Sequence, residues 1–350
     1  MVRLSRAELQ EHNRAKVLTA ARTEFTERGF RDAKIDQIAE RAELTRGAVY
    51  SNFPSKRALY FAVLAQVAEE SATPEYPPTA ATATGALADF ARSWLARLPL
   101  ATDDLRSASR LDRDLLPEVM ADTRTSQPFA QLTSLSAIVL GLCLERLRPS
   151  RRMVRVAELA LTTLHGAGQL AAAAPGFGEP FAVVNACAEL VSLDLDDRWE
   201  PAHLPHVSPA RPVDQPWTPP DATDVLRAQP APWHRDGVVA VLGLHRLVAI
   251  EEALRAAPPE AEVNLVVVTG DPGELGPLAR LAITGLRGCL SAAVARSHWP
   301  RLRIVFDESV ATAAGVSAVS DATEAAVRIS NGRIVARADG FGACHAAASA

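Results

Sequence analysis

The sequence predicts a fold whose N-terminal two-thirds is all-α and whose C-terminal part is α/β. Apolar residues recur at helical spacing up to about residue 197, whereas short β-rich apolar runs at 237–243 (GVVAVLG) and 263–269 (VNLVVVT) follow a proline-rich stretch. A length of 350 residues leaves room for two or three domains. We expect segments at 1–55, 56–198, 199–236 and 237–350.

The first segment is predicted to form three helices. A helix over 8–28 is indicated by apolar residues at helical spacing, with Gly29 as its stop. A second helix over 35–41 is followed by a tight break at Glu43-Leu44, and a third helix begins at Thr45, a natural N-cap. The expected core of this helix-turn-helix unit is Val17, Leu18, Ala21, Phe25, Phe30, Ile35, Ile38, Leu44, Val49 and Phe53.

The stretch 34–56 is the part of the chain whose residue order implies a specific chemistry. Its second helix carries Arg46, Gly47, Ala48, Tyr50, Ser51 and Asn52 in place of an apolar face. Most of the surface of this helix is therefore available to a partner.

Residues 12–65 resemble the DNA-binding head of the tetracycline-repressor (TetR) family of bacterial transcription regulators. The matching positions are Ala21, Phe25, Gly29-Phe30, Ile35, Ile38-Ala39, Ala42, Leu44-Thr45, Gly47, Val49-Tyr50, Asn52-Phe53, Lys56 and Leu59. Ala33 and Lys34 depart from the threonines that usually open the second helix, and Glu43 replaces the usual glycine of the turn. The turn therefore requires a left-handed backbone at Glu43.

The resemblance implies a role for each position of a DNA interface. Arg46 can donate two hydrogen bonds to a guanine edge, and the small residues Ala48 and Ser51 let the helix approach the bases. Tyr50, Asn52 and Lys56 correspond to phosphate-binding positions. The predicted DNA-binding set is Lys34, Thr45, Arg46, Gly47, Ala48, Tyr50, Ser51, Asn52 and Lys56, with Arg31 as an additional phosphate partner. The alternative makes Tyr50 a core aromatic and Arg46 a solvated surface residue.

The charge distribution is consistent with a local phosphate contact. Residues 1–60 hold 12 Lys and Arg against 8 Asp and Glu, a net charge of +4. Because the whole chain has a net charge of −4, the other 290 residues carry −8. The negative total argues against nucleic-acid binding over the whole surface. From charge alone, an ordinary solvated face explains the basic segment equally well.

The cysteines and the apolar runs indicate a cytoplasmic protein. Cys143, Cys187, Cys289 and Cys344 form no CxxC pair, which points to a reducing compartment without a disulfide framework. The N-terminus is too charged for a signal peptide, and the most apolar run, 159–174, is interrupted and too short to cross a bilayer. We expect no membrane segment, no metal site and no cofactor.

The second segment is predicted to be an antiparallel helical bundle, with helices at 56–71, 85–98, 103–124, 128–147, 151–174 and 180–195. The resemblance implies an effector cavity among the middle helices and a homodimer formed by the last two. The candidate cavity residues are Trp94, Arg110, Met120, Phe129 and Cys143, and plain core packing is the alternative for each. Their composition suggests a small, mostly apolar effector, with Arg110 as an anchor for an acid group.

Residues 199–236 are predicted to be an extended linker. Nine prolines fall in 201–232, and the linker should separate two independently cored units while its tryptophans pack in places. After it, strands are expected at 237–243, 263–269, 303–307, 325–329 and 333–338, with helices at 246–257, 275–297 and 309–314 and a turn at Ser330-Asn331-Gly332.

This order of elements, and the stretches VFDESVATAAGVSAV and RISNGRIVARADGF, resemble the thioredoxin-like fold. The residues of its active site do not carry over. The turn where that fold holds its reactive thiol is Gly243-Leu244-His245-Arg246, and Ser320 stands near the position of its cis-proline. The domain is therefore predicted to be redox-inactive.

Three functions fit these patterns. The leading hypothesis is a homodimeric, ligand-responsive transcription regulator, a repressor rather than an enzyme, that binds palindromic operator DNA. The second is an oxidoreductase or thiol-responsive regulator that uses Cys289 and Cys344 in the C-terminal domain. The third makes that domain an interaction or extra dimerisation module, which the missing thiols favour.

Overall fold

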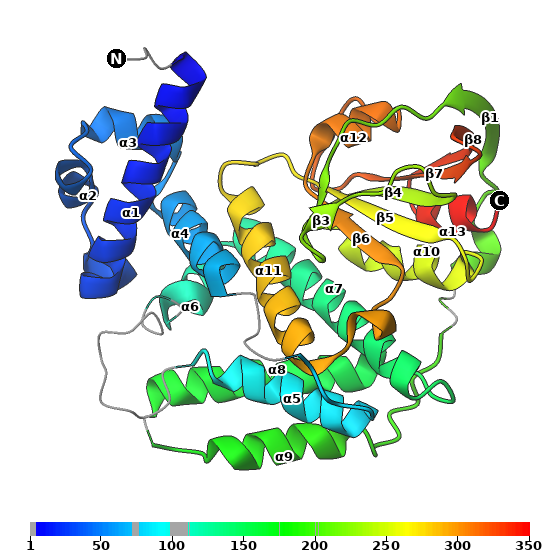
Figure 1. The fold of residues 1–350 in the computed structure, drawn as a ribbon, viewed down its shortest axis with the longest axis horizontal. Coiled ribbons are helices and arrows are strands. Elements are labelled where there is room, and N and C mark those ends of the chain that lie inside the picture. The colour runs from blue at the N-terminus through cyan, green and yellow to red at the C-terminus, as the bar shows by residue number, and fades with distance from the viewer. Residues whose placement is uncertain are drawn as a thin grey trace.

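The N-terminal head contains the three predicted helices. The computed structural model describes residues 5–71, 77–98, 111, 113–174, 176–199, 201 and 203–350. Its first helices are α1 (Arg6–Asp32), α2 (Ile35–Arg41) and α3 (Arg46–Asn52), shown at one end of the molecule in Figure 1. The predicted stop at Gly29 is confirmed as a kink, because this residue leaves the helical conformation with φ 75°. Glu43 has φ 56°, so the turn takes the predicted left-handed backbone.

Six further helices form the body: α4 (Lys56–Ser71), α5 (Ala83–Leu95), α6 (Leu115–Met120), α7 (Thr123–Leu147), α8 (Val154–Ala173) and α9 (Pro180–Leu190). Of the helix expected at 103–124, residues 103–110 and 112 lie outside the described residues, and the described part is interrupted at Ala121-Asp122, between α6 and α7. α9 starts where predicted, because the Glu179 side chain accepts hydrogen bonds from the backbone N–H groups of Phe181 and Ala182. It ends five residues earlier than predicted, at Leu190 rather than 195.

One helix among the described residues, α7, is long and apolar enough to cross a membrane by length and composition. In this structure 61% of its most apolar stretch is buried inside the protein. α7 packs against α8, α11 and the segment 247–249. Its apolar character is therefore explained by its place in the protein core.

The C-terminal part contains a six-stranded mixed sheet in the order β1-β8-β7-β4-β5-β6. The strands are β1 (Arg211–Pro216), β4 (Gly237–Gly243), β5 (Glu262–Val268), β6 (Leu302–Val305), β7 (Glu324–Ser330) and β8 (Arg333–Asp339). The pairs β4–β5 and β5–β6 are parallel, and the other pairs are antiparallel. The predicted hairpin turn is confirmed by positive φ at Asn331 and Gly332.

Helices cover both faces of this sheet (Figure 1). α10 (Ile250–Ala256) and α13 (Ala343–Ala348) pack on the face that includes Val238 and Ala240, whereas α12 (Glu308–Ala313) packs on the face that includes Val239 and Val241. Strands buried on both faces require the continuous apolar runs seen in the sequence. A mixed sheet with flanking helices is therefore present.

Residues 199–236 do not form the expected linker. β1 extends the sheet by pairing with β8, and a short hairpin of β2 (Thr223–Asp224) and β3 (Gln229–Pro230) follows. Asp224 is buried and accepts a hydrogen bond from the backbone N–H of Ile304 at 3.2 Å. The predicted tryptophan packing is confirmed, since the Trp217 and Trp233 rings lie 5.9 Å apart. The proline-rich composition indicates a linker, but β1 lies at the edge of the sheet, where proline is tolerated in a strand.

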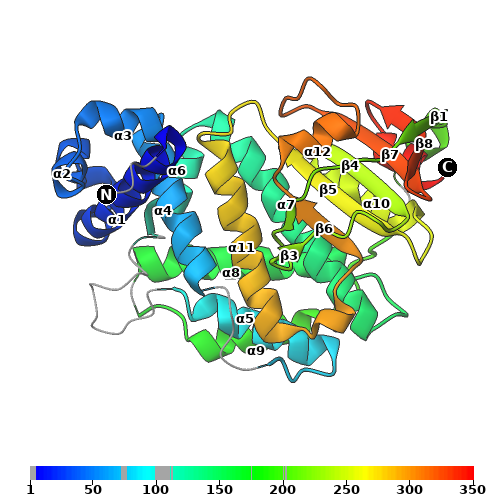
Figure 2. The same cartoon turned by 45° about the horizontal axis from the view of Figure 1, so that its top comes forward.

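The expectation of two independently cored units is wrong. The long helix α11 (Leu275–Ala293) leaves the sheet and packs against α4, α5 and α7 of the body (Figures 1 and 2). Its side chains Leu278, Ile283 and Leu286 are buried in one apolar cluster that also contains residues of the head, the body and the sheet. The helical periodicity of α11 reveals that a face is buried but not which partner buries it.

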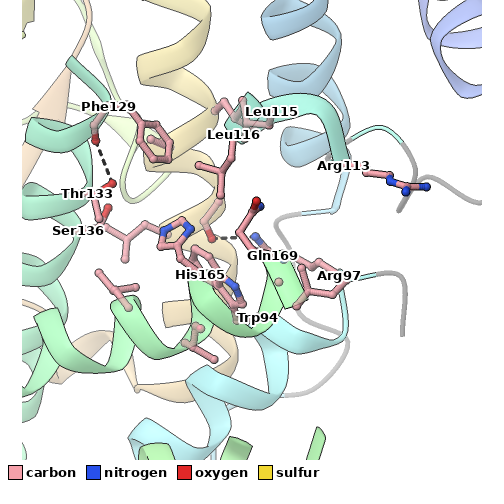
Figure 3. Close-up of a pocket in the computed structure, with 18 of the residues that line it drawn as sticks. Trp94, Arg97, Arg113, Leu115, Leu116, Phe129, Thr133, Ser136, His165 and Gln169 are labelled. Atoms are coloured by element: carbon pink, nitrogen blue, oxygen red, sulfur yellow. Dashed lines mark hydrogen bonds between the residues drawn. The ribbon is translucent and has the colours of Figure 1, made fainter. Parts of the chain in front are cut away.

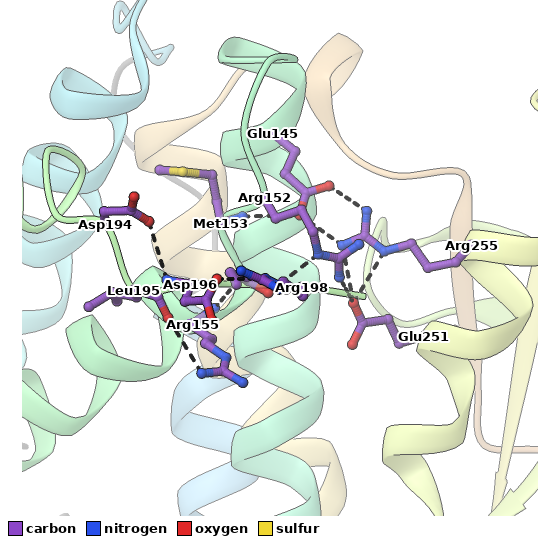
Figure 4. Close-up of polar contacts among 11 residues, drawn as sticks. Glu145, Arg152, Met153, Arg155, Asp194, Leu195, Asp196, Arg198, Glu251 and Arg255 are labelled. Atoms are coloured by element: carbon purple, nitrogen blue, oxygen red, sulfur yellow. Dashed lines mark hydrogen bonds and ion pairs between the residues drawn. The ribbon is translucent and has the colours of Figure 1, made fainter. Parts of the chain in front are cut away.

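An ionic network joins the sheet unit to the body at a second place (Figure 4). Arg255 on α10 donates to both carboxylate oxygens of Glu145 on α7, at 2.5 and 2.8 Å. Glu251, also on α10, accepts from Arg255 and from Arg152 at 3.1 and 3.0 Å. Burial raises the pKa of Glu251, and the two arginines beside it counter this shift. The bidentate geometry fixes α10 against the end of α7.

Candidate nucleic-acid interface and effector cavity

Helix α3 packs against the head through few buried side chains, and most of its other side chains are exposed to solvent. Val49 is its buried residue, and Phe53, which follows the helix, is buried as well. The Thr45 hydroxyl oxygen accepts a hydrogen bond from the backbone N–H of Ala48 at 3.2 Å, which confirms the predicted N-cap. Arg46, Gly47, Tyr50 and Ser51 are exposed, and Ala48 and Asn52 are half-buried. A helix with one anchoring face leaves the others free for a partner.

Arg46 and Tyr50 lie together on this exposed surface. The Arg46 guanidinium is 5.6 Å from the centre of the Tyr50 ring and 3.3 Å from a carboxylate oxygen of Asp36. Hydrogen bonding to Tyr50 and the charge of Asp36 raise the pKa of Arg46. Tyr50 is 41% exposed, which excludes the core-aromatic alternative. Because an exposed ion pair contributes little free energy, Arg46 can exchange Asp36 for another acceptor at small cost.

Further predicted DNA-binding side chains come from the end of α3, the N-cap of α2 and the start of α4. The Asn52 side-chain amide donates to the carbonyl oxygen of Ala48 at 2.8 Å, so part of its bonding capacity is used within α3. Lys34 is the exposed N-cap of α2. Lys56 donates to the carbonyl oxygen of Arg31 at 3.1 Å and lies 4.7 Å from the centre of the Phe30 ring. Partial burial lowers the pKa of Lys56.

A cavity of about 180 Å³ lies among α5, α7, α8 and α11 (Figure 3). Of the predicted cavity residues, Trp94 and Phe129 line it. Met120 is 76% exposed and Cys143 is fully buried, and neither lines the cavity. Arg110 lies outside the described residues. The lining residues that were not predicted are Arg97, Leu98, Arg113, Leu115, Leu116, Thr133, Ser136, Leu161, Leu164, His165, Gly168, Gln169, Ala172, Leu278, Leu281, Ala282, Gly285 and Leu286.

His165 gives this apolar cavity a polar recognition group. Its ring lies edge-on to Trp94 and Phe129, with centroids 4.8 and 6.0 Å apart (Figure 3). Burial lowers the pKa of His165, so the imidazole is neutral near pH 7 and can donate or accept one hydrogen bond. The Thr133 and Ser136 hydroxyls donate to carbonyl oxygens of their own helix. The interruption of the apolar run 159–174 by His165 was the sequence signal for this residue.

The lowered pKa of His165 predicts a specific pH dependence of stability. The unfolded chain binds this proton more readily than the folded chain, so stability from this group is complete above its ordinary pKa of 6.5 and is lost as the pH falls. The midpoint of thermal unfolding should therefore drop more between about pH 7.5 and 5.5 in the native chain than in a His165→Gln variant. Equal drops would contradict the assignment of a neutral, buried imidazole.

The cysteines offer little support for a redox site. All four are buried, and burial raises the pKa of Cys143 to about 12 and that of Cys187 to about 11. Burial also raises the pKa values of Cys289 and Cys344. Since the thiolate is the reactive form, these environments disfavour the thiol-sensor hypothesis. In the part of the chain that the structure describes, no group of three or more His, Cys, Asp or Glu side chains is placed to hold a metal ion.

Comparison with known proteins identifies the head. Residues 17–63 match the model of the family described as bacterial regulatory proteins, tetR family. The head of this chain is thus similar to a tetR-type head. The match begins in the middle of α1 and ends in α4, so it includes the whole helix-turn-helix and the exposed face of α3.

Curated relatives share the tetR-type head with this chain. The transcriptional regulator SrpR of Pseudomonas putida is 45% identical over 65 residues, 19% of this chain and 30% of its own. TtgW, an uncharacterised regulator also from P. putida, is 45% identical over 65 residues, 19% of this chain and 48% of its own length. The activator FasR of Mycolicibacterium smegmatis is 40% identical over 55 residues, 16% of this chain and 25% of its own length. The alignments thus span less than half of each relative.

A solved structure of a TetR-like transcriptional regulator from Rhodococcus sp. RHA1 aligns with 54% of this chain and 97% of its own, at 19% identity and a TM-score of 0.30. So low a score supports no argument about the rest of the fold. The assignment of a DNA-binding regulator therefore rests on the similarity of the head to the tetR family and on the geometry of α3.

Proposed function

We propose that this chain is a ligand-responsive, cytoplasmic transcription regulator that binds palindromic operator DNA as a homodimer and represses the genes beside it. The observation that carries the proposal is the exposed face of α3, where Arg46, Tyr50 and Ser51 project from a tetR-type head. A helix with long donors flanked by small residues suits the major groove. One relative is named an activator, so a reporter assay decides the direction of regulation.

The surface of α8 and α9 supports the homodimer. Leu170 is 48% exposed, and Phe177 and Phe181 are 67% and 73% exposed on the connection between the two helices and the first turn of α9. Exposed large apolar side chains, here on neighbouring segments of the chain, are typical of an interface between subunits. Two copies joined here would each present one head to DNA.

The cavity beside His165 supports the response to a ligand. Leucine side chains together with Trp94 and Phe129 make up half of the residues that line it. We propose that a small, mostly apolar molecule binds there and uses a hydrogen-bonding group to engage the neutral imidazole. We further propose that the C-terminal sheet unit is a redox-inactive, thioredoxin-like module that supports the body, on the basis of its strand order and its buried thiols.

Binding to the DNA upstream of the gene for this protein tests the proposal. A gel-shift experiment at moderate salt should show a discrete complex that unlabelled specific duplex displaces more readily than unrelated DNA. Absence of any complex at moderate salt would rule out the proposed target.

Lys56 provides a separate test of how the head holds DNA. Lys56→Ala is expected to weaken binding to all sequences to a similar extent and to lower the slope of log affinity against log salt by about one, because one phosphate contact is lost. Affinity should be measured by fluorescence anisotropy at several salt concentrations. An unchanged slope would show that Lys56 does not contact a phosphate, and would leave it the structural role of donating to the Arg31 carbonyl oxygen.

A further inference from the structure

Helix α11 lies between the effector cavity and the head. Leu278, Leu281 and Gly285 on α11 line the cavity beside residues of α5, α7 and α8. The same helix lies alongside α4, which leads from the head into the body (Figures 1 and 2). α11 is contributed by the C-terminal segment, outside the region that matches the tetR family model. It therefore adds a second structural connection, parallel to α4, between cavity and head.

The N-terminal end of α11 is bonded to the junction between α3 and α4. Glu274, the N-cap residue of α11, accepts a hydrogen bond from the Ser55 hydroxyl at 2.7 Å and one from Arg57 Nε at 2.6 Å. Arg57 also donates to Asp122, the N-cap of α7, at 3.1 Å. The side chains of Arg57 and Glu274 are 17% and 13% exposed. A largely buried pair of this kind holds its geometry better than a surface pair.

Backbone packing at the same point leaves little room. A Cβ atom on Gly273 would lie 2.9 Å from Cγ of Pro54, the residue before Ser55. Farther along, a groove of about 420 Å³ separates the head from the ends of β5 and β6, with Leu18 and Asn52 on one wall and Val267 and Phe306 on the other. The contact at Glu274 thus connects the start of α11 to the head beside this groove.

We propose that α11 is a strut that transmits occupancy of the cavity to the DNA-binding head, with Glu274 as the latch between them. This inference rests on the proposed function and concerns the regulation of that site. A ligand that displaces the cavity-lining residues of α11 moves the whole helix, because the helix is stiff, and so also moves its N-terminal end. The latch then passes this shift to Ser55 and Arg57 and so to the orientation of α3.

A double-mutant cycle on the full-length chain tests the strut. Gly168→Leu fills the cavity from α8 and stands in for a ligand, since a Cβ there meets only the flexible Leu98 side chain at 3.3 Å. Glu274→Ala removes the latch. Glu260→Ala is the matched control, because Glu260 is 87% exposed and pairs with Arg301 at the surface. The readout is the dissociation constant for a duplex that the native protein selects from a random pool.

Filling the cavity should change the dissociation constant at least about fivefold in the native and Glu260→Ala backgrounds, and less than about twofold in the Glu274→Ala background. Equal changes in all three backgrounds, or no change in the native one, overturn the strut. Failure of the native chain to bind any selected duplex would count against the proposed function instead. If Glu274→Ala does not fold, Glu274→Gln replaces it, because glutamine keeps an acceptor oxygen but loses the charge. This variant must also reduce the effect of cavity filling on the dissociation constant.

Discussion

Replacing Arg46 and Tyr50 together by alanine is expected to lower affinity for the specific duplex by roughly 30- to 1000-fold, the largest effect of any pair of surface substitutions. Loss of a bidentate arginine–guanine contact costs about 1–3 kcal/mol, and the phosphate contact of Tyr50 adds to it. The fold should be retained, because both side chains are exposed and bond mainly to each other and to Asp36. Fluorescence anisotropy with the specific duplex measures the loss.

Arg92→Ala is the matched control for this experiment. Arg92 is exposed on α5 and pairs with Asp89, much as Arg46 pairs with Asp36, but it lies outside the head. Its replacement should leave DNA affinity unchanged within about twofold. Wild-type affinity in the Arg46→Ala/Tyr50→Ala variant would show that α3 does not read DNA.

Ending the chain at residue 198 is expected to abolish cooperative folding of the remaining body. The truncation removes α11, whose Leu278, Ile283, Leu286 and Leu290 side chains are buried against it. Burial of each such side chain contributes about 1.5–3 kcal/mol, and their sum is comparable with the whole stability of about 5–15 kcal/mol of a typical domain. Thermal unfolding followed by circular dichroism measures the effect.

A milder pair of variants checks the same claim without truncation. Ile283→Ala should destabilise the full chain by about 2–5 kcal/mol, whereas Val248→Ala, at a residue that is 38% exposed, should cost much less. A 1–198 fragment that melts cooperatively at the temperature of the full chain would refute a shared core and restore the division into separate units.

The head could be predicted from sequence because its signals are local. The Thr45 cap, the break at Glu43 and the apolar positions of α2 and α3 each depend on residues a few positions apart. The strands were found for a similar reason, since 237–243 is apolar along its whole length and is buried along its whole length. Sequence patterns over a few residues were sufficient to predict these elements, because residues close in the sequence determine them.

The shared core and the cavity could not be predicted in this way. Periodicity assigned α11 a buried face, but only the tertiary structure shows that the face meets α4, α5 and α7 rather than the sheet alone. Met120 and Cys143 are cavity candidates in the sequence, but an apolar residue type alone does not distinguish an exposed side chain from a core or cavity-lining one. His165 was visible in the sequence as a polar interruption, and its role depends on the aromatic rings that the fold brings to it.

Selection of duplexes from a randomised DNA pool by the full-length protein tests the central claim most directly. A homodimer with two equivalent α3 helices should enrich an inverted repeat, with half-sites whose spacing is fixed by the distance between the heads. The same selection with the Arg46→Ala/Tyr50→Ala variant should lose that motif. Recovery of an inverted repeat by the native chain would support a dimeric, sequence-reading regulator, and a pool that stays random at moderate salt would contradict it.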